Sequence, residues 1–537
     1  MANIAFYGSH NSAYVIENNG EILSVLEIER FLNRKNCGMA QYITPKADDI
    51  VFLAKYISNY IMNKFGINEF ENCYYLNTDV NHYGLHRLEE FIPAKNYINC
   101  LHHEAHAAGS FYQSPHKEAL IFSFDGGGND GFFNIYTCKR GESPKLLEQV
   151  LNPNNKTANV HYDLGFPYMV IAHFLSDINF EDLGMGNLTY PGKLMGLSSY
   201  GTVRKEWLLP FMKFYKSNPN GLNYQQKIND LGIEIGIVFD TNNRIGGNVG
   251  YDLAATSQRA FEDSFIEVAK PYMKQYSNLP ICIAGGCGLN ILLNTRIATE
   301  FKRNVFVGPD PNDCGIALGM MLNILKPELP YDSTYSGIEI LDMNLIQQYI
   351  NNPKINFKSN YLDNDLLVND LCEGKIVGVA RGNSEHGPRA LGNRSILCNP
   401  SISSMKDVLN QKVKHREWYR PFAPVVRLED VSKYFEWDKE SRWMSFCPKV
   451  RKKWRKKLAA ITHVDNTARV QTVTREQNTW LYDLLTDIEK KTGVGVLLNT
   501  SFNVNGKPIL STLGDAFNIF ENTDMDCLLI ENYYIRK

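Results

Sequence analysis

Short apolar segments separated by polar or glycine-containing turns recur in the first quarter of the chain. Residues 3–7 are mostly apolar, residues 9–11 are polar, and residues 13–26 form two further apolar runs around Asn-Asn-Gly. Such runs predict a β-strand followed by a hairpin. Residues 119–137 repeat the arrangement, because an apolar run reaches Asp125 and returns after a glycine-rich turn. We therefore predict a duplicated α/β core.

A change of pattern marks the boundary between two domains. Residues 326–363 hold prolines, serines and asparagines, and a new α/β pattern of apolar runs follows them. At 537 residues the chain exceeds the size at which one hydrophobic core usually suffices. We place a first domain at residues 1–345, a linker at 346–365 and a second domain at 366–537.

The charges are nearly balanced, with 56 basic and 58 acidic residues and a formal net charge of −2. Global charge therefore steers the protein neither to membranes nor to nucleic acids, and any polyanion site must be local. No apolar run approaches the roughly 18 residues of a membrane span, and the first residues do not resemble a signal peptide. We therefore expect cytoplasmic residence. The eleven cysteines form no Cys-x-x-Cys pair and are expected to be reduced, mostly buried thiols.

Two histidines and an aspartate follow a pattern typical of metal ligands. His102 and His106 are four residues apart, so that on a helix they lie on one face. Asp125 ends an apolar run where a glycine turn exposes its carboxylate. Asp313, at the start of a helical stretch, is the fourth candidate, although an aspartate there is also typical of a helix N-cap. Two imidazoles with two carboxylates suit Fe²⁺, Mn²⁺ or Zn²⁺ better than Ca²⁺ or Mg²⁺.

Other interpretations of the histidine segment remain open. Histidines at this spacing also occur on ordinary polar helix faces, and a strand-ending aspartate can simply cap a turn. The zinc-protease pattern is a poorer match, because residues 103–106 read His-Glu-Ala-His and are one residue short of His-Glu-x-x-His. A metal at this place therefore requires a different fold.

Two glycine-containing segments are candidates for holding a nucleotide. Gly285 and Gly286 end an apolar run and precede a helical stretch, so that their backbone amides can face phosphate oxygens. The same pattern is typical of a tight strand-to-helix turn. Lys193 lies between a glycine and an apolar run, where a lysine either neutralises a phosphate or is simply solvated.

Three arginines follow a buried strand at the start of the second domain, namely Arg381, Arg389 and Arg394. This is more positive charge than a simple turn requires. Guanidinium groups bind phosphate oxygens in pairs, so the segment indicates a site for an acyl phosphate and a nucleoside triphosphate. A surface ion-pair network is the alternative interpretation.

Together these motifs resemble the O-carbamoyltransferase family, which includes the NodU-type nodulation, cephamycin and tobramycin enzymes. The resemblance spans nearly the whole chain. In the first domain it rests on His-x-x-x-His at 102–106, Asp-Gly-Gly-Gly at 125–128, Gly-Lys-Leu-Met-Gly at 192–196 and Ala-Gly-Gly-Cys-Gly-Leu-Asn at 284–290. In the second domain it rests on strings at 410–424, 463–473 and 498–506. It implies two α/β domains, an actin-like or sugar-kinase-like (TsaD-like) core followed by a YrdC-like domain.

The resemblance also implies roles for individual residues. In the second domain it implies ligands for phosphate, the carbamoyl group and the adenylate: Arg389, Lys414, Arg420, Arg469, Asn499 and Ser501. In the first domain it implies nucleotide contacts from Lys193, Gly285, Gly286 and Asn290, and it supports the metal ligands His102, His106, Asp125 and Asp313, with Fe²⁺ the expected ion. His10 is an expected base or acceptor ligand. The family has His-Asp at this turn, whereas this chain has His10-Asn11.

The implied chemistry has two stages. In the second domain, carbamoyl phosphate and ATP with Mg²⁺ would give carbamoyl adenylate, which keeps the carbamoyl group activated. In the first domain, the metal would polarise the carbonyl group while the hydroxyl of a small-molecule acceptor attacks it. The products would be an O-carbamate and AMP. The resemblance further implies a homodimer.

A basic run at residues 449–457 suggests a different acceptor, because it holds seven cations and a tryptophan in nine positions. Such a run can contact a phosphate backbone, and the acceptor would then be a hydroxymethylated base in DNA or its nucleotide. A solvated helix face is the other interpretation. A non-catalytic, ATP-dependent binding or regulatory protein is an alternative of another class, but two separate phosphate sites argue against it. A threonylcarbamoyl-type tRNA modifier uses related domains, normally on separate chains.

Overall fold

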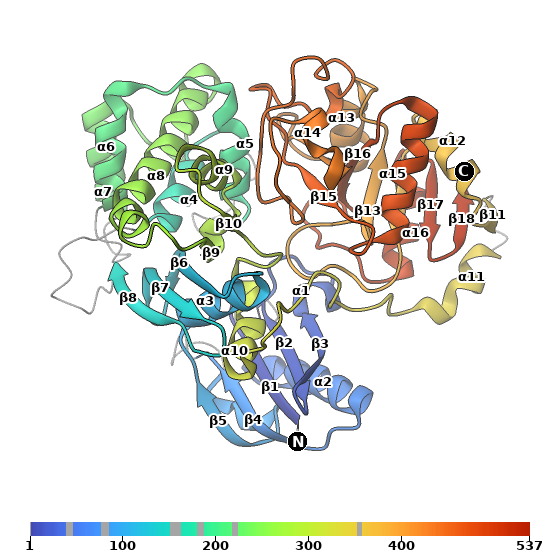
Figure 1. The fold of residues 1–537 in the computed structure, drawn as a ribbon, viewed down its shortest axis with the longest axis horizontal. Helices are drawn as coiled ribbons and strands as arrows, with labels where there is room; N and C mark the ends of the chain where they lie inside the picture. Colours follow the sequence, from blue (N-terminus) through green and yellow to red (C-terminus); the bar gives the residue numbers. More distant parts are fainter. Residues whose placement is uncertain are drawn as a thin grey trace. The chain divides into compact units, whose positions relative to one another are not determined.

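The computed structural model divides into two compact units (Figure 1). The first unit comprises Met1–Glu29 and Asn36–Asp332, and the second comprises Arg30–Lys35 and Ser333–Lys537. The structure describes residues 2–38, 47–76, 85–150, 163–179, 187–216, 224–351 and 357–537. A six-residue segment near the start of the chain therefore belongs to the second unit.

The first unit holds two five-stranded sheets with the same strand plan (Figure 1). The central strand of each sheet has an antiparallel neighbour on one side and a parallel neighbour on the other. The antiparallel neighbour is the next strand along the chain in both sheets. The first sheet has the order β3-β2-β1-β4-β5 and consists of β1 (Ala2–Tyr7), β2 (Ala13–Asn18), β3 (Glu21–Glu27), β4 (Phe70–Tyr75) and β5 (Ala94–Asn99). The second has the order β10-β9-β6-β7-β8 and consists of β6 (Glu118–Gly128), β7 (Gly131–Lys139), β8 (Lys145–Val150), β9 (Ile281–Ala284) and β10 (Val305–Phe306). The repeated plan confirms the predicted duplicated α/β core.

The inner strands of these sheets are apolar because both of their faces are covered. Residues 4–7 of β1 are all buried, and so are all four residues of β9. Strands buried on both faces lack the alternation of apolar and polar residues that marks half-exposed strands. The continuous apolar runs in the sequence therefore have a direct structural cause.

Helices α3 (His102–Gln113) and α10 (Ile316–Leu325) pack closely against each other. A Cβ atom on Gly319 of α10 would lie 2.0 Å from the carbonyl oxygen of Ala105 in α3, so only glycine permits this approach. The contact holds the start of α10 near the histidine face of α3. The other helices assigned here are α2 (Ala47–Phe65), α4 (Gly165–His173), α5 (Tyr190–Leu197), α6 (Lys205–Lys216), α7 (Tyr224–Ile235), α8 (Gly247–Gln275) and α9 (Ile291–Glu300), while the short α1 (Ile28–Phe31) crosses the boundary between the units.

The second unit is built on an eight-stranded mixed sheet with the order β11-β18-β17-β12-β13-β16-β14-β15 (Figure 1). Its strands are β11 (Lys358–Tyr361), β12 (Val377–Ala380), β13 (Arg394–Cys398), β14 (Ala423–Arg427), β15 (Gln471–Val473), β16 (Val496–Ser501), β17 (Cys527–Ile530) and β18 (Tyr533–Arg536). Its helices are α11 (Ile346–Ile350), α12 (Asn364–Cys372), α13 (Met405–Val408), α14 (Val431–Tyr434), α15 (Thr479–Thr492) and α16 (Leu513–Asn522). Apolar residues of α12 and α15 pack on the sheet in one buried cluster. This unit, too, is of the α/β class.

The division between the units falls at Asp332 and Ser333, whereas the sequence analysis set it at residue 345. The segment predicted as a linker, 346–365, takes part in the second unit. Tyr349 of α11 stacks on Phe517 with ring centroids 4.7 Å apart, and β11 pairs with β18.

Two further sequence expectations bear on the class of protein. No helix in the described ranges is long and apolar enough to cross a membrane. All eleven cysteines are free, and eight of them are buried. The latter observation confirms the prediction of mostly buried thiols.

Candidate metal centre and phosphate site

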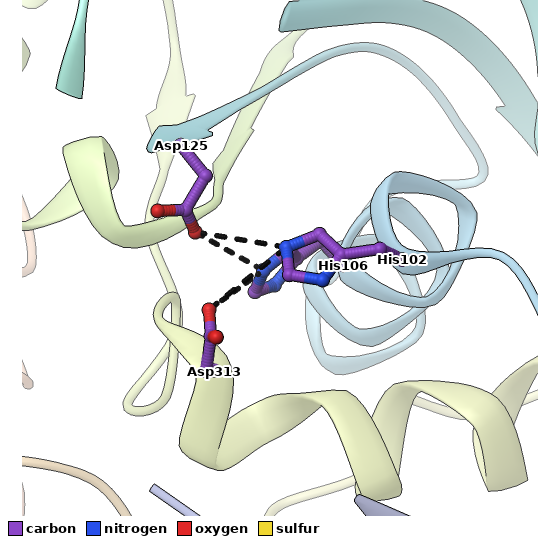
Figure 2. Close-up of side chains that lie close together, drawn as sticks. All are labelled: His102, His106, Asp125 and Asp313. Carbon is purple, nitrogen blue, oxygen red and sulfur yellow. Dashed lines mark ion pairs between the residues drawn. The ribbon is translucent and has the colours of Figure 1, made fainter. Parts of the chain in front are cut away.

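The four predicted metal ligands meet in the first unit, with their side chains pointing toward one another (Figure 2). His102 and His106 lie on α3, Asp125 lies in β6, and Asp313 begins the turn that leads into α10. His106 Nε2 is 3.4 Å from Asp125 Oδ2 and 3.5 Å from Asp313 Oδ1. His102 Nε2 is 3.9 Å from each of the same two oxygens. One ligand atom from each residue lies within 4.8 Å of all the others.

This donor set fits a divalent cation. Ligand atoms about 2.1 Å from one ion lie about 3.0–3.5 Å apart at octahedral to tetrahedral angles, and the nitrogen–oxygen distances here are 3.4 to 3.9 Å. Both ring nitrogens of His102 and Nε2 of His106 are buried and have no hydrogen-bond partner among the described residues. Buried polar atoms without a partner are rare, and an ion would satisfy the two Nε2 atoms.

The charges of the four residues also favour a cation. Burial alone would lower the pKa of His106, but Asp125 and Asp313 raise it to about 9. Burial alone would raise the pKa of Asp125, but His102 and His106 hold it well below its usual range. The metal-free site therefore carries a proton on His106 at neutral pH. A divalent ion must displace this proton in order to bind.

Two residues at the end of β1 and in the following turn approach Asp313. Tyr7 donates its hydroxyl to Asp313 Oδ2 at 2.5 Å, and His10 Nε2 lies 3.4 Å from the same oxygen. The other ring nitrogen of His10 lies 3.2 Å from Asn11 Oδ1. Asn11 can therefore orient His10 by accepting a hydrogen bond from Nδ1–H. An aspartate carboxylate, expected at this position from the family resemblance, is not required for that. His10 could be predicted from the sequence but Tyr7 could not, because a tyrosine that ends a buried strand carries no signal of such a contact.

His103, between the two candidate ligands, has a different role. Its Nδ1 lies 2.8 Å from Ser123 Oγ, and its Nε2 lies 3.0 Å from the carbonyl oxygen of Gly131. Burial, reinforced by His102, lowers the pKa of His103 to about 4, so the ring is neutral. Both nitrogens are engaged by the protein, and His103 ties α3 to β6 and β7.

The turn at Gly285 and Gly286 lies directly against the candidate ligand Asp125. Gly285 has φ +84°, and a Cβ atom there would lie 2.1 Å from the carbonyl oxygen of Phe124. The Gly286 amide donates to Asp125 Oδ2 at 2.6 Å. The close approach that glycine allows thus lets this turn hold a metal ligand in place.

Asn290 and Lys193, also predicted as nucleotide contacts, take part in contacts within the first unit. Asn290 Oδ1 accepts a 3.0 Å hydrogen bond from the Leu293 amide and caps α9. The Asn290 amide group also pairs with that of Gln258 through two hydrogen bonds of 3.0 Å. Lys193 is buried, and its ammonium donates to the carbonyl oxygen of Ile178 at 3.3 Å.

Five cations crowd together in the second unit. Burial and the neighbouring Arg420 lower the pKa of Arg389 to about 10. Burial, Arg389 and Arg420 hold the pKa of Arg469 well below its usual range. Burial, together with other members of the group, has the same effect on the pKa of Arg416 and of Lys414. Each positive charge is therefore destabilised by the others, and the group forms a site of strongly positive potential.

Carboxylates neutralise little of this charge. Among the described residues, these five cations form one ion pair with a carboxylate, between Arg420 NH1 and Glu417 Oε2 at 3.4 Å. The four arginines stay protonated in proteins, so with one paired carboxylate they alone leave an excess of three positive charges. A ligand with several negative charges would offset this excess.

Lys414 is held in a distorted part of the backbone. A π-helical turn at Leu409–Val413 precedes it, and His415 follows with φ +49°. Such conformations concentrate at functional sites. The Lys414 ammonium donates at 2.7 Å to the carbonyl oxygens of Ser501 and Asn503, and lies 3.3 Å from Ser501 Oγ. The structure thus brings Lys414 and Ser501 together from distant parts of the sequence.

Asn499 lies beside the loop that carries Arg389, since its amide donates to the Ala390 carbonyl oxygen at 3.1 Å. Arg389 is one of three arginines in that loop, and it is the one that joins the cationic cluster. Arg394 is fully buried, and its guanidinium donates to the backbone carbonyl oxygens of residues 338, 381, 382 and 393. Arg381 lies over the ring of Trp480, 4.8 Å from its centroid.

Arg416 is the member of the cluster that the sequence analysis did not name. Its Nε donates to Asn410 Oδ1 at 2.8 Å, and its guanidinium lies 4.4 Å from the centroid of the Phe422 ring. The available signal was its position between Lys414 and Arg420 in one short basic string.

Known proteins resemble the chain over both units. A family model described as "Carbamoyltransferase N-terminus" matches residues 83–322, and one described as "Carbamoyltransferase C-terminus" matches residues 368–537. The nodulation protein NolO of Bradyrhizobium diazoefficiens is 32% identical over 462 residues, which cover 81% of this chain and 78% of that protein. An uncharacterized protein of Methanocaldococcus jannaschii is 30% identical over 539 residues, covering 98% of each chain. The 3'-hydroxymethylcephem-O-carbamoyltransferase of Streptomyces clavuligerus is 36% identical over 291 residues, covering 53% of each.

Both family models and a relative of this similarity and coverage point to one conclusion: the chain belongs to the carbamoyltransferase family and is an enzyme that transfers carbamoyl groups.

Proposed function

We propose that the protein is an ATP-dependent O-carbamoyltransferase that works in two half-reactions. The second unit would convert carbamoyl phosphate, ATP and water into carbamoyl adenylate, pyrophosphate and phosphate. The first unit would transfer the carbamoyl group from the adenylate to a hydroxyl acceptor and release AMP. The observation that carries this proposal is the cluster of five cations with one carboxylate in the second unit.

The chemistry of this cluster matches the proposed substrates. ATP and carbamoyl phosphate are polyanions, and guanidinium groups bind pairs of phosphate oxygens, whereas Lys414 offers a compact point charge. Ser501 and Asn499 supply short polar side chains that suit the amide group of the carbamoyl moiety. Because water competes for all these groups, their partial burial strengthens each contact with a bound anion.

In the first unit, His102, His106, Asp125 and Asp313 would hold a divalent cation, with Fe²⁺ preferred and Mn²⁺ or Zn²⁺ as alternatives. When bound, the ion would supply Lewis-acid polarisation of the carbamoyl carbonyl group.

His10 would act as the proton acceptor of the transfer step. The acceptor oxygen forms a bond to the carbamoyl carbon, the bond from that carbon to the AMP oxygen breaks, and the hydroxyl proton passes to His10 Nε2. The hydrogen bond to Asn11 Oδ1 supports this role, because a proton held on Nδ1 leaves Nε2 free to accept another.

We further propose that the adenylate meets the first unit at the turn of Gly285 and Gly286, with Lys193 and Asn290 nearby in the same unit. The contact between the Gly286 amide and Asp125 supports this placement, because a nucleotide at the turn would lie beside the metal ligands.

A hydroxymethylated base in DNA, or its nucleotide, is the alternative acceptor. One observation favours it: the basic run 449–457 forms turns rather than a helix, and six of its seven cations are exposed. Trp454 anchors the run by packing on Tyr434, with ring centroids 4.8 Å apart. Among the described residues, no ion pair neutralises these cations. An ordered, unneutralised basic surface suits a phosphate backbone.

The two half-reactions can be tested separately with the full-length protein. ATP/pyrophosphate exchange that requires carbamoyl phosphate would support the adenylate-forming step. We expect Arg469→Ala and Lys414→Ala to abolish this exchange, and His106→Ala to preserve exchange while removing carbamoyl transfer. Equal loss of both activities in well-folded variants would contradict the division of labour. Absence of exchange in folded, metal-loaded wild-type protein would contradict the adenylate-forming step.

A further inference from the structure

We infer that residues 126–130, which comprise the end of β6 and the turn to β7, form the outer support of the metal centre. In this view Gly128 sets the orientation of the His102 ring by direct contact, and Asn129 and Asp130 fix the start of α3. None of these three residues is a metal ligand, so they are positioning residues. The inference rests on the metal centre of the proposed function and extends it to residues without an assigned role.

The orientation of the His102 ring needs a cause other than hydrogen bonding. Histidines that bind metals usually donate their second ring nitrogen to a carboxylate, carbonyl group or water, which fixes the ring. Among the described residues, neither ring nitrogen of His102 has a hydrogen-bond partner. Packing must therefore help to hold the ring, and Gly128 is one of the residues in close contact with it.

Gly128 lies so close to His102 that no other residue fits there. A Cβ atom on Gly128 would lie 2.6 Å from Cγ of the His102 ring and 2.7 Å from its Cδ2. Gly128 does not have φ in the left-handed region, so its backbone conformation is one that other residues can adopt. The requirement for glycine is therefore steric and is imposed by the histidine ring.

The two residues after Gly128 cap the helix that carries both histidines. Leu101, at the N-cap of α3, provides no side-chain cap. Instead, Asn129 Oδ1 accepts from the His102 amide at 3.0 Å, and Asp130 accepts from the amides of His103 and Glu104 at 2.9 Å and 3.3 Å. The first amides of a helix need such acceptors, and a buried carboxylate also interacts favourably with the positive end of the helix.

The segment 126–130 directly follows the ligand Asp125. Asp125 adjoins one end of the segment, the His102 ring contacts Gly128 in its middle, and the far end caps α3. The spacing between the carboxylate and the imidazoles is therefore set by one five-residue segment. A disturbance of this segment should change the geometry of the metal site without removing any ligand.

A matched pair of variants tests this inference. Gly126 lies in the same segment and also has φ outside the left-handed region, but a Cβ atom on it would meet no atom within 4 Å. Gly126→Ala and Gly128→Ala therefore make the same chemical change and differ in contact with His102. Both would be made in the full-length protein, stripped of metal and titrated with Co²⁺, whose visible absorption reports ligand geometry.

We expect Gly126→Ala to bind Co²⁺ like the wild-type protein. Gly128→Ala should bind it about 10- to 100-fold more weakly, the usual effect of a lost outer-shell contact, and with an altered spectrum. Exchange of ATP and pyrophosphate in the second unit should be unchanged in both variants. Wild-type affinity and spectrum in Gly128→Ala would overturn the inference.

A second variant covers the case in which Gly128→Ala does not fold. Asp130→Asn keeps the size of the side chain but removes its charge, and we expect weaker Co²⁺ binding with circular dichroism unchanged. Wild-type binding by Asp130→Asn would overturn the role of the helix cap. Absence of Co²⁺ binding in the wild-type protein would overturn the metal centre itself, and this inference with it, whereas binding by wild type that both variants retain would overturn this inference alone.

Discussion

Competition between a proton and a metal ion at His106 yields a quantitative prediction. Two aspartates raise the pKa of this buried histidine to about 9, so the metal-free protein holds the proton throughout the neutral range. Each metal ion that binds must release this proton. The apparent affinity for metal should therefore rise tenfold per pH unit, or about 100-fold between about pH 6.5 and 8.5, and level off near the pKa.

The same shift has a consequence for stability. Because the pKa of His106 is raised on folding, its stabilising contribution in the metal-free protein is fully present below the ordinary value of 6.5 and is lost as the pH rises through about 9. A shift of this size corresponds to on the order of 3 kcal/mol. The melting temperature of metal-free protein should fall across this window, and the stabilisation by added metal should grow across it.

Calorimetric titration with Mn²⁺ in buffers of different ionisation enthalpy would measure both affinity and the number of protons released. We expect close to one proton per ion at pH 7. His103 should not contribute, because its pKa of about 4 leaves it neutral in this range. Equal affinity at both ends of the pH range, or binding without proton release, would refute the reasoning.

Three further predictions concern the remaining features. Arg416→Ala should reduce carbamoyl phosphate-dependent ATP/pyrophosphate exchange at least about tenfold, since it removes a guanidinium proposed to bind phosphate. Co²⁺ binding should stay unchanged, and exchange at the wild-type rate would exclude Arg416 from the site. Asn290→Ala should lower the free energy of unfolding by about 1–2 kcal/mol through loss of a helix cap and the pairing with a glutamine, and an unchanged urea midpoint would contradict this. Replacing Lys452, Lys453 and Lys456 with glutamine should weaken DNA binding and reduce its salt dependence by about one unit per lost phosphate contact; DNA affinity equal to wild type, or none in wild type at low salt, would count against the alternative acceptor.

The repeated strand plan and the four clustered side chains could be predicted because they depend on local patterns. Short apolar runs separated by turn residues predict strands and hairpins without knowledge of distant contacts. His102 and His106 share a helix face because they are four residues apart. Asp125 was a candidate because a glycine turn follows its apolar run, and Asp313 because it begins a helical stretch. The resemblance to a family supported both. The structure then brought all four within one site.

Tertiary contacts decided what the sequence left undetermined. His103 is chemically identical to its neighbours, and only the positions of Ser123 and Gly131 show that both its nitrogens are engaged. Arg394 looked like a phosphate ligand in a loop of arginines, yet backbone carbonyl groups surround its guanidinium. Arg416 belongs to the cationic cluster because Arg420 and the distant Arg469 lie close enough to help burial lower its pKa. No local pattern encodes such partners.

The insertion of helices α4 to α8 into the second sheet has a consequence for how this protein can change. The chain leaves that sheet at its edge strand β8 and re-enters it at β9, which pairs directly with β6. The first helix of the insertion abuts the metal ligands, since a Cβ atom on Gly165 would lie 2.7 Å from the Gly126 amide nitrogen. Because loops that enter and leave a sheet at fixed strands tolerate large changes in length, this helical layer can be exchanged or enlarged by recombination while Asp125 stays in place. On the proposed function, such an exchange would let a protein of this plan acquire new acceptors without rebuilding the proposed metal centre.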